Sequence, residues 1–221
     1  MLSKLYPRRF EIFFISQMAI LFGSLLVPST WFEDILSPIL FQVNLLAGIL
    51  MISKKRKLMW FFVALLLITA VIFGSSILKN TDEKLYGFIR MGTYFLFYVT
   101  VCLEIIKQVW KSEKISGNVI LGLISGYVSL GLIGFFICLS IEMAHPNSFQ
   151  GLLIAGVGSD ILTDRLMYYS YITLLTIGYG DIIPTTPLAQ KAAVLVGIMG
   201  QFYLVIITAT IVGKYINQSE T

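Results

Sequence analysis

Charged residues are scarce in this sequence: only 13% of its 221 residues are Asp, Glu, Lys or Arg, whereas 57% are apolar. The mean hydropathy is +0.86, which is more than the surface of a soluble domain can carry. The sequence also lacks catalytic motifs. It has only one histidine and two cysteines, it has no phosphate-binding loop, and no nucleophilic residue stands at motif spacing from a general base. We therefore expect a membrane protein that is not an enzyme and needs no cofactor.

The apolar residues gather in six stretches of the length that crosses a bilayer core, which takes about 20 helical residues. These predicted spans are residues 12–31, 35–53, 58–78, 85–110, 119–141 and 189–216. A further apolar stretch, residues 162–175, is only about 14 residues long and suits a re-entrant half-helix better than a span. The expected fold is all-α, with a four-helix transmembrane domain at 1–115 and a second domain at 116–221.

Basic residues indicate how the spans are oriented. In a six-span topology, one side of the membrane receives the following residues: Lys4, Arg8, Arg9, Lys54, Lys55, Arg56, Lys57, Lys107, Lys111, Lys114 and Lys214. Loops that are rich in Lys and Arg stay in the cytoplasm. We therefore expect both termini to be cytoplasmic, and the half-helix to open toward the outer face of the cell membrane.

A short motif with two glycines follows the half-helix directly. It reads Thr176-Ile177-Gly178-Tyr179-Gly180-Asp181. The motif resembles the signature of the potassium channel family, and it lies where that family has it, between a short pore helix and a final long helix. Glycine can take backbone conformations closed to other residues, which lets successive carbonyls point to one side and replace the water around a potassium ion.

The resemblance implies a role for each residue of the motif. Residues 176–180 would form the selectivity filter, with K⁺ as the permeant ligand. The ion would bind at Thr176, Ile177, Gly178 and Tyr179, and the Thr176 hydroxyl would add an oxygen at the inner end.

Residues of the half-helix resemble the family's supports for the filter. Tyr168 and Tyr169 stand where family members place aromatic residues that hydrogen-bond behind the filter. A buried tyrosine hydroxyl needs a partner, and Asp181 is the obvious acceptor. Thr173, on the same half-helix, is counted with these supports. Ile172 occupies a place that some family members fill with a glutamate.

The last apolar stretch resembles the family's inner helix. Gly200 stands where many family members have a gating hinge, and a close contact between helices is the other interpretation of this glycine. Helical spacing from Gly200 predicts a cavity-lining face without a carboxylate. That face consists of Leu204, Thr208, Val212 and Ile216.

The first four spans resemble a voltage sensor that is poor in charge. Six-span family members often carry basic residues at every third position of the fourth span, whereas this span has Arg90 and Lys107 near its two ends. Glu104 can pair with Lys107 at i+3. Gln17 and Asn44 are expected to be hydrogen-bonding anchors between helices. We therefore predict weak or absent voltage dependence.

One filter strand supplies one row of oxygens, so a pore needs several copies, and the resemblance implies four. The sequence thus predicts a homotetrameric, potassium-selective channel, whose partners are three identical subunits and the lipid bilayer, with no nucleic acid. A less selective monovalent cation channel is the alternative, which Tyr179 and Asp181 oppose because relaxed filters usually depart from the motif there. A third interpretation is a membrane receptor or enzyme with an accidental motif.

Overall fold

The computed structural model describes residues 5–28, 31–53, 55–78, 83–112, 116–152 and 160–219. The chain divides into two compact units, Met1–Gly126 and Tyr127–Thr221, and each is described by itself. Of the basic residues that indicate the orientation, Lys4, Lys54 and Lys114 lie outside the described residues.

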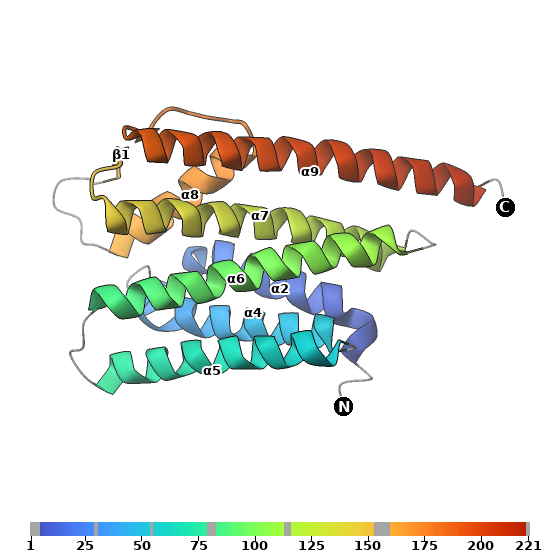
Figure 1. The fold of residues 1–221 in the computed structure, drawn as a ribbon, viewed down its shortest axis with the longest axis horizontal. Helices are drawn as coiled ribbons and strands as arrows, with labels where there is room; N and C mark the ends of the chain where they lie inside the picture. The colour runs from blue at the N-terminus through green and yellow to red at the C-terminus, as the bar shows by residue number, and fades with distance from the viewer. Residues whose placement is uncertain are drawn as a thin grey trace. The chain divides into compact units, whose positions relative to one another are not determined.

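Four α-helices that run side by side form most of the first unit (Figure 1). They are α2 (Arg9–Phe22), α4 (Ser37–Ile52), α5 (Arg56–Leu78) and α6 (Glu83–Trp110). Shorter helical turns accompany the first two, namely η1 (Tyr6–Arg8), η2 (Gly23–Leu25) and η3 (Phe32–Leu36). The beginning of α7 (Gly117–Ala144) also belongs to this unit.

Three helices among the described residues are long and apolar enough to cross a membrane. They are Leu85–Trp110, Gly117–Ala144 and Pro187–Ile216, and they correspond to the fourth, fifth and sixth predicted spans. Ser37–Ile52 is apolar but shorter, and α2 gives way to a tighter turn at Gly23, before the predicted end of the first span. The three long helices support a membrane location, while the six-span topology remains a prediction.

Aromatic side chains fill the centre of the first unit. Phe13, Phe62 and Phe97 are buried, and the Phe97 ring centroid lies 5.0 Å from that of Phe62 and 6.4 Å from that of Phe13. Gly48 makes room for this cluster, since a Cβ there would lie 2.5 Å from the Phe97 ring. Aromatic pairs at these distances add about 0.5–1.5 kcal/mol each beyond their area burial. Three of the helices, α2, α5 and α6, therefore share one packed core.

Two buried amide side chains join helices of the first unit. The Asn44 Nδ2 donates to Ser16 Oγ at 2.8 Å, and the Tyr98 hydroxyl donates to Asn44 Oδ1 at 2.9 Å. The Gln17 Nε2 donates to the Ser125 carbonyl at 3.2 Å. A polar group in an apolar setting is costly unless it is hydrogen-bonded. The predicted role of Gln17 and Asn44 as anchors between helices is confirmed.

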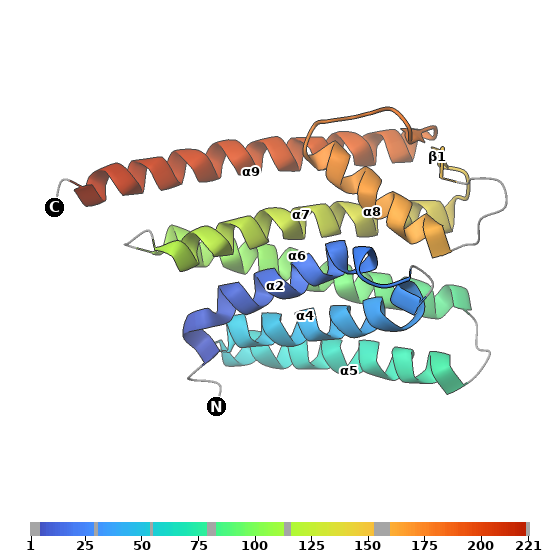
Figure 2. The same ribbon diagram turned by 180° about the vertical axis from the view of Figure 1, so that it is seen from behind.

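The second unit contains the rest of α7, the helices α8 (Asp160–Leu174) and α9 (Pro187–Ser219), and the strands β1 (Phe149–Gln150) and β2 (Ile183–Pro184). The helix α8 runs obliquely between α7 and α9 in both views (Figures 1 and 2). With 15 residues, it is about 22 Å long, short of the roughly 30 Å core of a bilayer. A short helix thus lies where the half-helix was predicted.

Local sequence signals set the start of α9. The Thr186 hydroxyl accepts from the Ala189 amide at 3.3 Å, as a helix N-cap does. Pro187 is the first helical residue, a position where the missing N–H of proline is not needed. β2 ends just before this cap and pairs antiparallel with β1, with Phe149 opposite Pro184. The glycine-containing motif therefore lies between α8 and a strand that is held in place.

Candidate functional site

The motif that begins at Thr176 is anchored to the end of α8. The amides of Ile177 and Gly178 both donate to the Ile172 carbonyl, at 2.9 and 3.4 Å, and the Thr176 amide donates to the Thr173 carbonyl at 3.0 Å. These bonds use carbonyls that the last turn of a helix leaves without an intrahelical partner. The first half of the motif is thus held directly against the helix that precedes it.

Every second residue of the motif has a positive φ angle. The values are +58° at Thr176, +58° at Gly178 and +79° at Gly180, whereas Ile177 and Tyr179 are not among the positive-φ residues. Alternation of positive and negative φ angles along a turn can bring successive N–H groups to one side of a chain and the carbonyls to the other. The motif is therefore neither helix nor strand.

Thr176 is an uncommon residue for this conformation. A residue with a Cβ costs roughly 1–2 kcal/mol in the left-handed region, and a β-branched residue is a marked outlier there. Such strain is concentrated at functional sites. At Gly178 and Gly180, an added Cβ would meet no atom within 4 Å. The two glycines therefore supply backbone freedom and not space.

The side chains of the motif are exposed in the single chain. Ile177 is 48% exposed and Tyr179 is 70% exposed, although both side chains are largely apolar. Exposed apolar surface of this kind is typical of a site that contacts other protein or membrane. The surface around the motif therefore exposes apolar side chains that this chain's core does not fully cover.

Tyr168 and Tyr169 have different partners. The Tyr168 side chain is 39% exposed, and desolvation of its hydroxyl, a hydrogen bond to the Asp181 carboxylate and the charge of that carboxylate together raise its pKa. Tyr169 instead hydrogen-bonds with Thr173, and its ring centroid lies 5.2 Å from that of Phe149. Of the two predicted supports, Tyr168 is the one that the structure brings to Asp181.

Two main-chain carbonyls of α7 hold α8 in place. Ser170 Oγ donates to the Gly131 carbonyl and the Tyr171 hydroxyl donates to the Val128 carbonyl, both at 2.7 Å. A Cβ at Gly131 would lie 2.2 Å from the Tyr171 ring, and one at Gly134 would lie 2.5 Å from Ser170 Oγ. The sequence analysis missed these contacts, for which the glycines at i and i+3 on the fifth predicted span were the available signal.

The loop between α7 and α8 reaches the far end of the motif. The Glu142 carboxylate accepts from the backbone amides of Asn147 at 2.7 Å and of Phe149 at 3.2 Å. Gly151 has a φ of +90°, and a Cβ there would lie 2.2 Å from the Asp181 carbonyl oxygen. The backbone of the loop therefore packs directly against Asp181, a contact that sequence reasoning did not predict.

Gly200 lies where α9 passes the end of α8. A Cβ at this position would lie 2.3 Å from the Leu174 carbonyl oxygen, so the two backbones touch. The Tyr127 hydroxyl donates to the same carbonyl at 3.3 Å. The structure thus contains the close contact that was one interpretation of Gly200, and a hinge role remains a prediction. The predicted cavity-lining side chains are exposed on α9, namely Leu204, Thr208, Val212 and Ile216.

Residues 152–218 match a family model described as an ion channel. The match supports the interpretation of this chain as part of an ion channel. The matched residues include the anchored motif and the close contact at Gly200, so the part of the chain with the unusual backbone is also the part that resembles known channels. Comparisons with curated proteins and with solved structures find no match.

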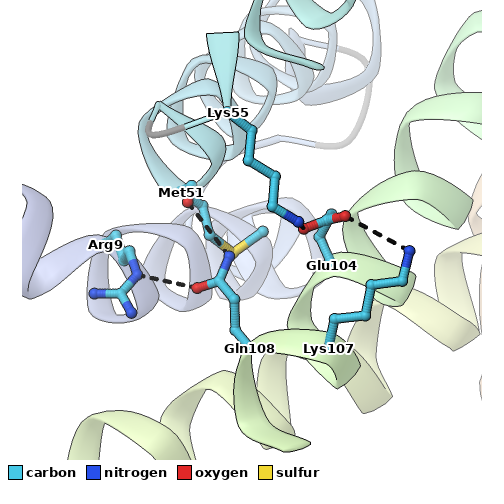
Figure 3. A network of polar contacts seen from close by, with 6 residues as sticks. All are labelled: Arg9, Met51, Lys55, Glu104, Lys107 and Gln108. Atoms are coloured by element: carbon cyan, nitrogen blue, oxygen red, sulfur yellow. Dashed lines mark hydrogen bonds and ion pairs between the residues drawn. The ribbon is translucent and has the colours of Figure 1, made fainter. Parts of the chain in front are cut away.

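The charged residues at one end of α6 form a network in the first unit (Figure 3). The Glu104 carboxylate is buried and binds Lys107 Nζ at 3.8 Å and Lys55 Nζ. The predicted pair of Glu104 and Lys107 is confirmed. Beside it, Gln108 Oε1 accepts from Arg9 Nε at 3.3 Å. Glu104, the only acidic residue well inside α6, is thus already paired with two lysine side chains.

Proposed function

We propose that this chain is one subunit of a homotetrameric channel that conducts K⁺ selectively and passively across the cell membrane. The observation that carries the proposal is the alternating backbone of Thr176, Gly178 and Gly180, in a motif that resembles the potassium channel signature. A dehydrated K⁺ ion needs a cage of oxygens in place of its water. Successive carbonyls on one side of a chain supply such oxygens.

The end of α8 adds an electrostatic argument for a cation. The carbonyl end of a helix carries a partial negative charge, equivalent to about half an elementary charge. Thr176 follows Leu174, the last residue of α8, by two positions. Half-helices whose carbonyl ends point at an ion occur in other membrane transport proteins. This arrangement favours cations over anions at the inner end of the motif.

Several copies of the chain are needed to surround an ion. One motif offers one row of carbonyls, and irregular backbone at membrane depth is stable only where it is buried in protein or lines water. Both conditions are met if the exposed Ile177 and Tyr179 contact neighbouring subunits around a symmetry axis. Four subunits are the number that the family resemblance implies.

The remaining assignments follow from the same proposal. Residues 176–179 would bind K⁺, and Asp181, Tyr168, Tyr169 and Thr173 would support the filter. The domain at 1–115 would not act as a strong voltage sensor for the pore domain at 116–221, and both termini would be cytoplasmic.

Ion flux from liposomes tests the proposal. We expect the purified protein to release K⁺ much faster than Na⁺, and we expect Gly178→Ala to lose conduction or selectivity, because alanine is strained at a φ of +58°. Gly92→Ala is the matched control, since a Cβ at Gly92 meets nothing within 4 Å. This variant should keep the flux.

Two outcomes would count against this function. Equal rates of K⁺ and Na⁺ release from the unmodified protein would favour the less selective cation channel. A Gly178→Ala variant that kept the original permeability ratio would show that the motif is not the filter. Chemical cross-linking of the purified protein should give a tetramer, and a monomer that conducts ions would overturn the proposed assembly.

A further inference from the structure

Gln201 is an unusual residue in the middle of α9. Between Ala192 and Ile207, the only side chains with a hydrogen-bonding group are Gln201 and Tyr203. An amide at membrane depth is costly unless it finds a polar partner. Polar groups in such places often mark the path of a ligand or an ion.

The partner of Gln201 is the first residue of the filter motif. The Gln201 Nε2 donates to Thr176 Oγ1 at 3.4 Å. The preceding residue makes this possible, because Gly200 has no Cβ to separate α9 from the Leu174 carbonyl. The close contact at Gly200 thus brings the amide of an otherwise apolar helix to the inner end of the motif.

The hydrogen bond changes what the Thr176 hydroxyl can offer to a cation. A hydroxyl oxygen has two lone pairs, and the amide of Gln201 occupies one of them. The donated N–H also places the positive end of a dipole beside the oxygen. Both effects weaken the attraction between this oxygen and a bound cation.

We propose that Gln201 is a specificity-determining residue of the channel, which sets the cation affinity of the innermost filter position through the Thr176 hydroxyl. This inference rests on the proposed function, because it takes the Thr176 oxygen as an ion ligand. It goes further in assigning to α9 a side chain that acts on the filter itself. The remaining N–H of the amide and its Oε1 stay available at the exposed surface of the subunit.

Block of the channel by Ba²⁺ measures the affinity of this position. Ba²⁺ has nearly the radius of K⁺ and a double charge, so it binds oxygen ligands of K⁺ more strongly and stops the current. The channel is recorded in planar bilayers, with Ba²⁺ added to each side in turn. The block from the side of the C-terminal end of α9 reports the inner position.

Gln201→Leu removes the amide and keeps a similar volume. We expect the half-blocking concentration of Ba²⁺ from the inner side to fall by about fivefold, the effect of one ordinary hydrogen bond. Gln201→Asn, which is one methylene shorter and keeps the amide, should shift it in the same direction, because the shorter side chain does not reach Thr176. The matched control is Gln190→Leu near the start of α9, which should leave the inner block unchanged.

The dependence on Thr176 separates this mechanism from a general effect of polarity. In a Thr176→Val background, Gln201→Leu should cause no further shift, because no hydroxyl remains to be affected. The same shift in both backgrounds would overturn the inference. An unchanged or higher half-blocking concentration in Gln201→Leu and Gln201→Asn, in a channel that still selects K⁺, would also overturn it while leaving the proposed function standing. Absence of K⁺ current in the unmodified protein would instead contradict the proposed function.

Discussion

Tyr168 and Tyr169 are neighbours on α8, yet they lie in different surroundings. Tyr168 donates to Asp181, whereas Tyr169 lies against Phe149 and hydrogen-bonds with Thr173. Adjacent residues on a helix point about 100° apart, so both cannot approach one carboxylate. The family resemblance predicted that both tyrosines support the filter, and Asp181 was the expected acceptor. It could not say which tyrosine reaches Asp181, because the rotation of α8 is set by its contacts with α7.

We predict that Tyr168→Phe shortens the open times of single channels by about fivefold, since it takes one hydrogen bond from Asp181 at the end of the filter. Tyr168→Trp, which keeps a ring N–H donor, should restore part of the open time. Tyr169→Phe should have a smaller effect, because Tyr169 has another partner. Open times that are equal in Tyr168→Phe and the unmodified channel would show that the bond does not support the filter.

At the scale of elements, the position of α8 depends on how closely it approaches α7. Gly131 and Gly134 leave room for Tyr171 and Ser170, and two carbonyls of α7 accept their hydroxyls. The existence and approximate length of α8 could be predicted from its apolar pattern, and the long spans likewise. The fit of Gly131 and Gly134 to the side chains of Tyr171 and Ser170 could not be predicted, because it depends on which faces of the helices meet.

Gly131→Ala should destabilise the channel in detergent by about 1–3 kcal/mol, the usual cost of an added methyl group in a packed interior. The reason is the Tyr171 ring, which lies 2.2 Å from the added Cβ and would have to move. Thermal unfolding of the purified protein measures the effect. Gly117→Ala is the control, since a Cβ at Gly117 meets nothing within 4 Å and alanine favours helix formation. A Gly131→Ala protein as stable as this control would contradict the tight contact.

At the scale of the whole molecule, the two units differ in how far the sequence could describe them. The second unit contains a motif that resembles a known filter signature, so the expected filter, its preceding helix and its following helix could be located in advance. In the first unit, the pairing of Lys55 with Glu104 joins residues 49 positions apart. No local pattern encodes that pair, because it depends on how α6 packs against α5.

The charges of the first unit predict a channel that responds only weakly to voltage. Moving one charge through the whole membrane field is worth about 2.3 kcal/mol per 100 mV, so steep gating needs several mobile charges in each subunit. Arg90 and Lys107 are the basic residues of α6 beyond its first turn, and Lys107 is paired with Glu104. Recordings over about ±100 mV should show a shallow change in open probability. A steep activation curve that disappears on neutralising Arg90 or Lys107 would contradict this.

The alternating φ angles of the motif have a consequence for its chirality. A φ of +79° at Gly180 is unfavourable for L-alanine but favourable for D-alanine. Since a Cβ at Gly180 meets no atom of the chain within 4 Å, the handedness of the substituent should matter more than its size. We therefore expect a semisynthetic channel with D-alanine at position 180 to keep its K⁺ flux, and one with L-alanine to lose it. At position 180 the channel would thus function with D-alanine, which ribosomes do not incorporate, and would fail with the L-alanine that they do.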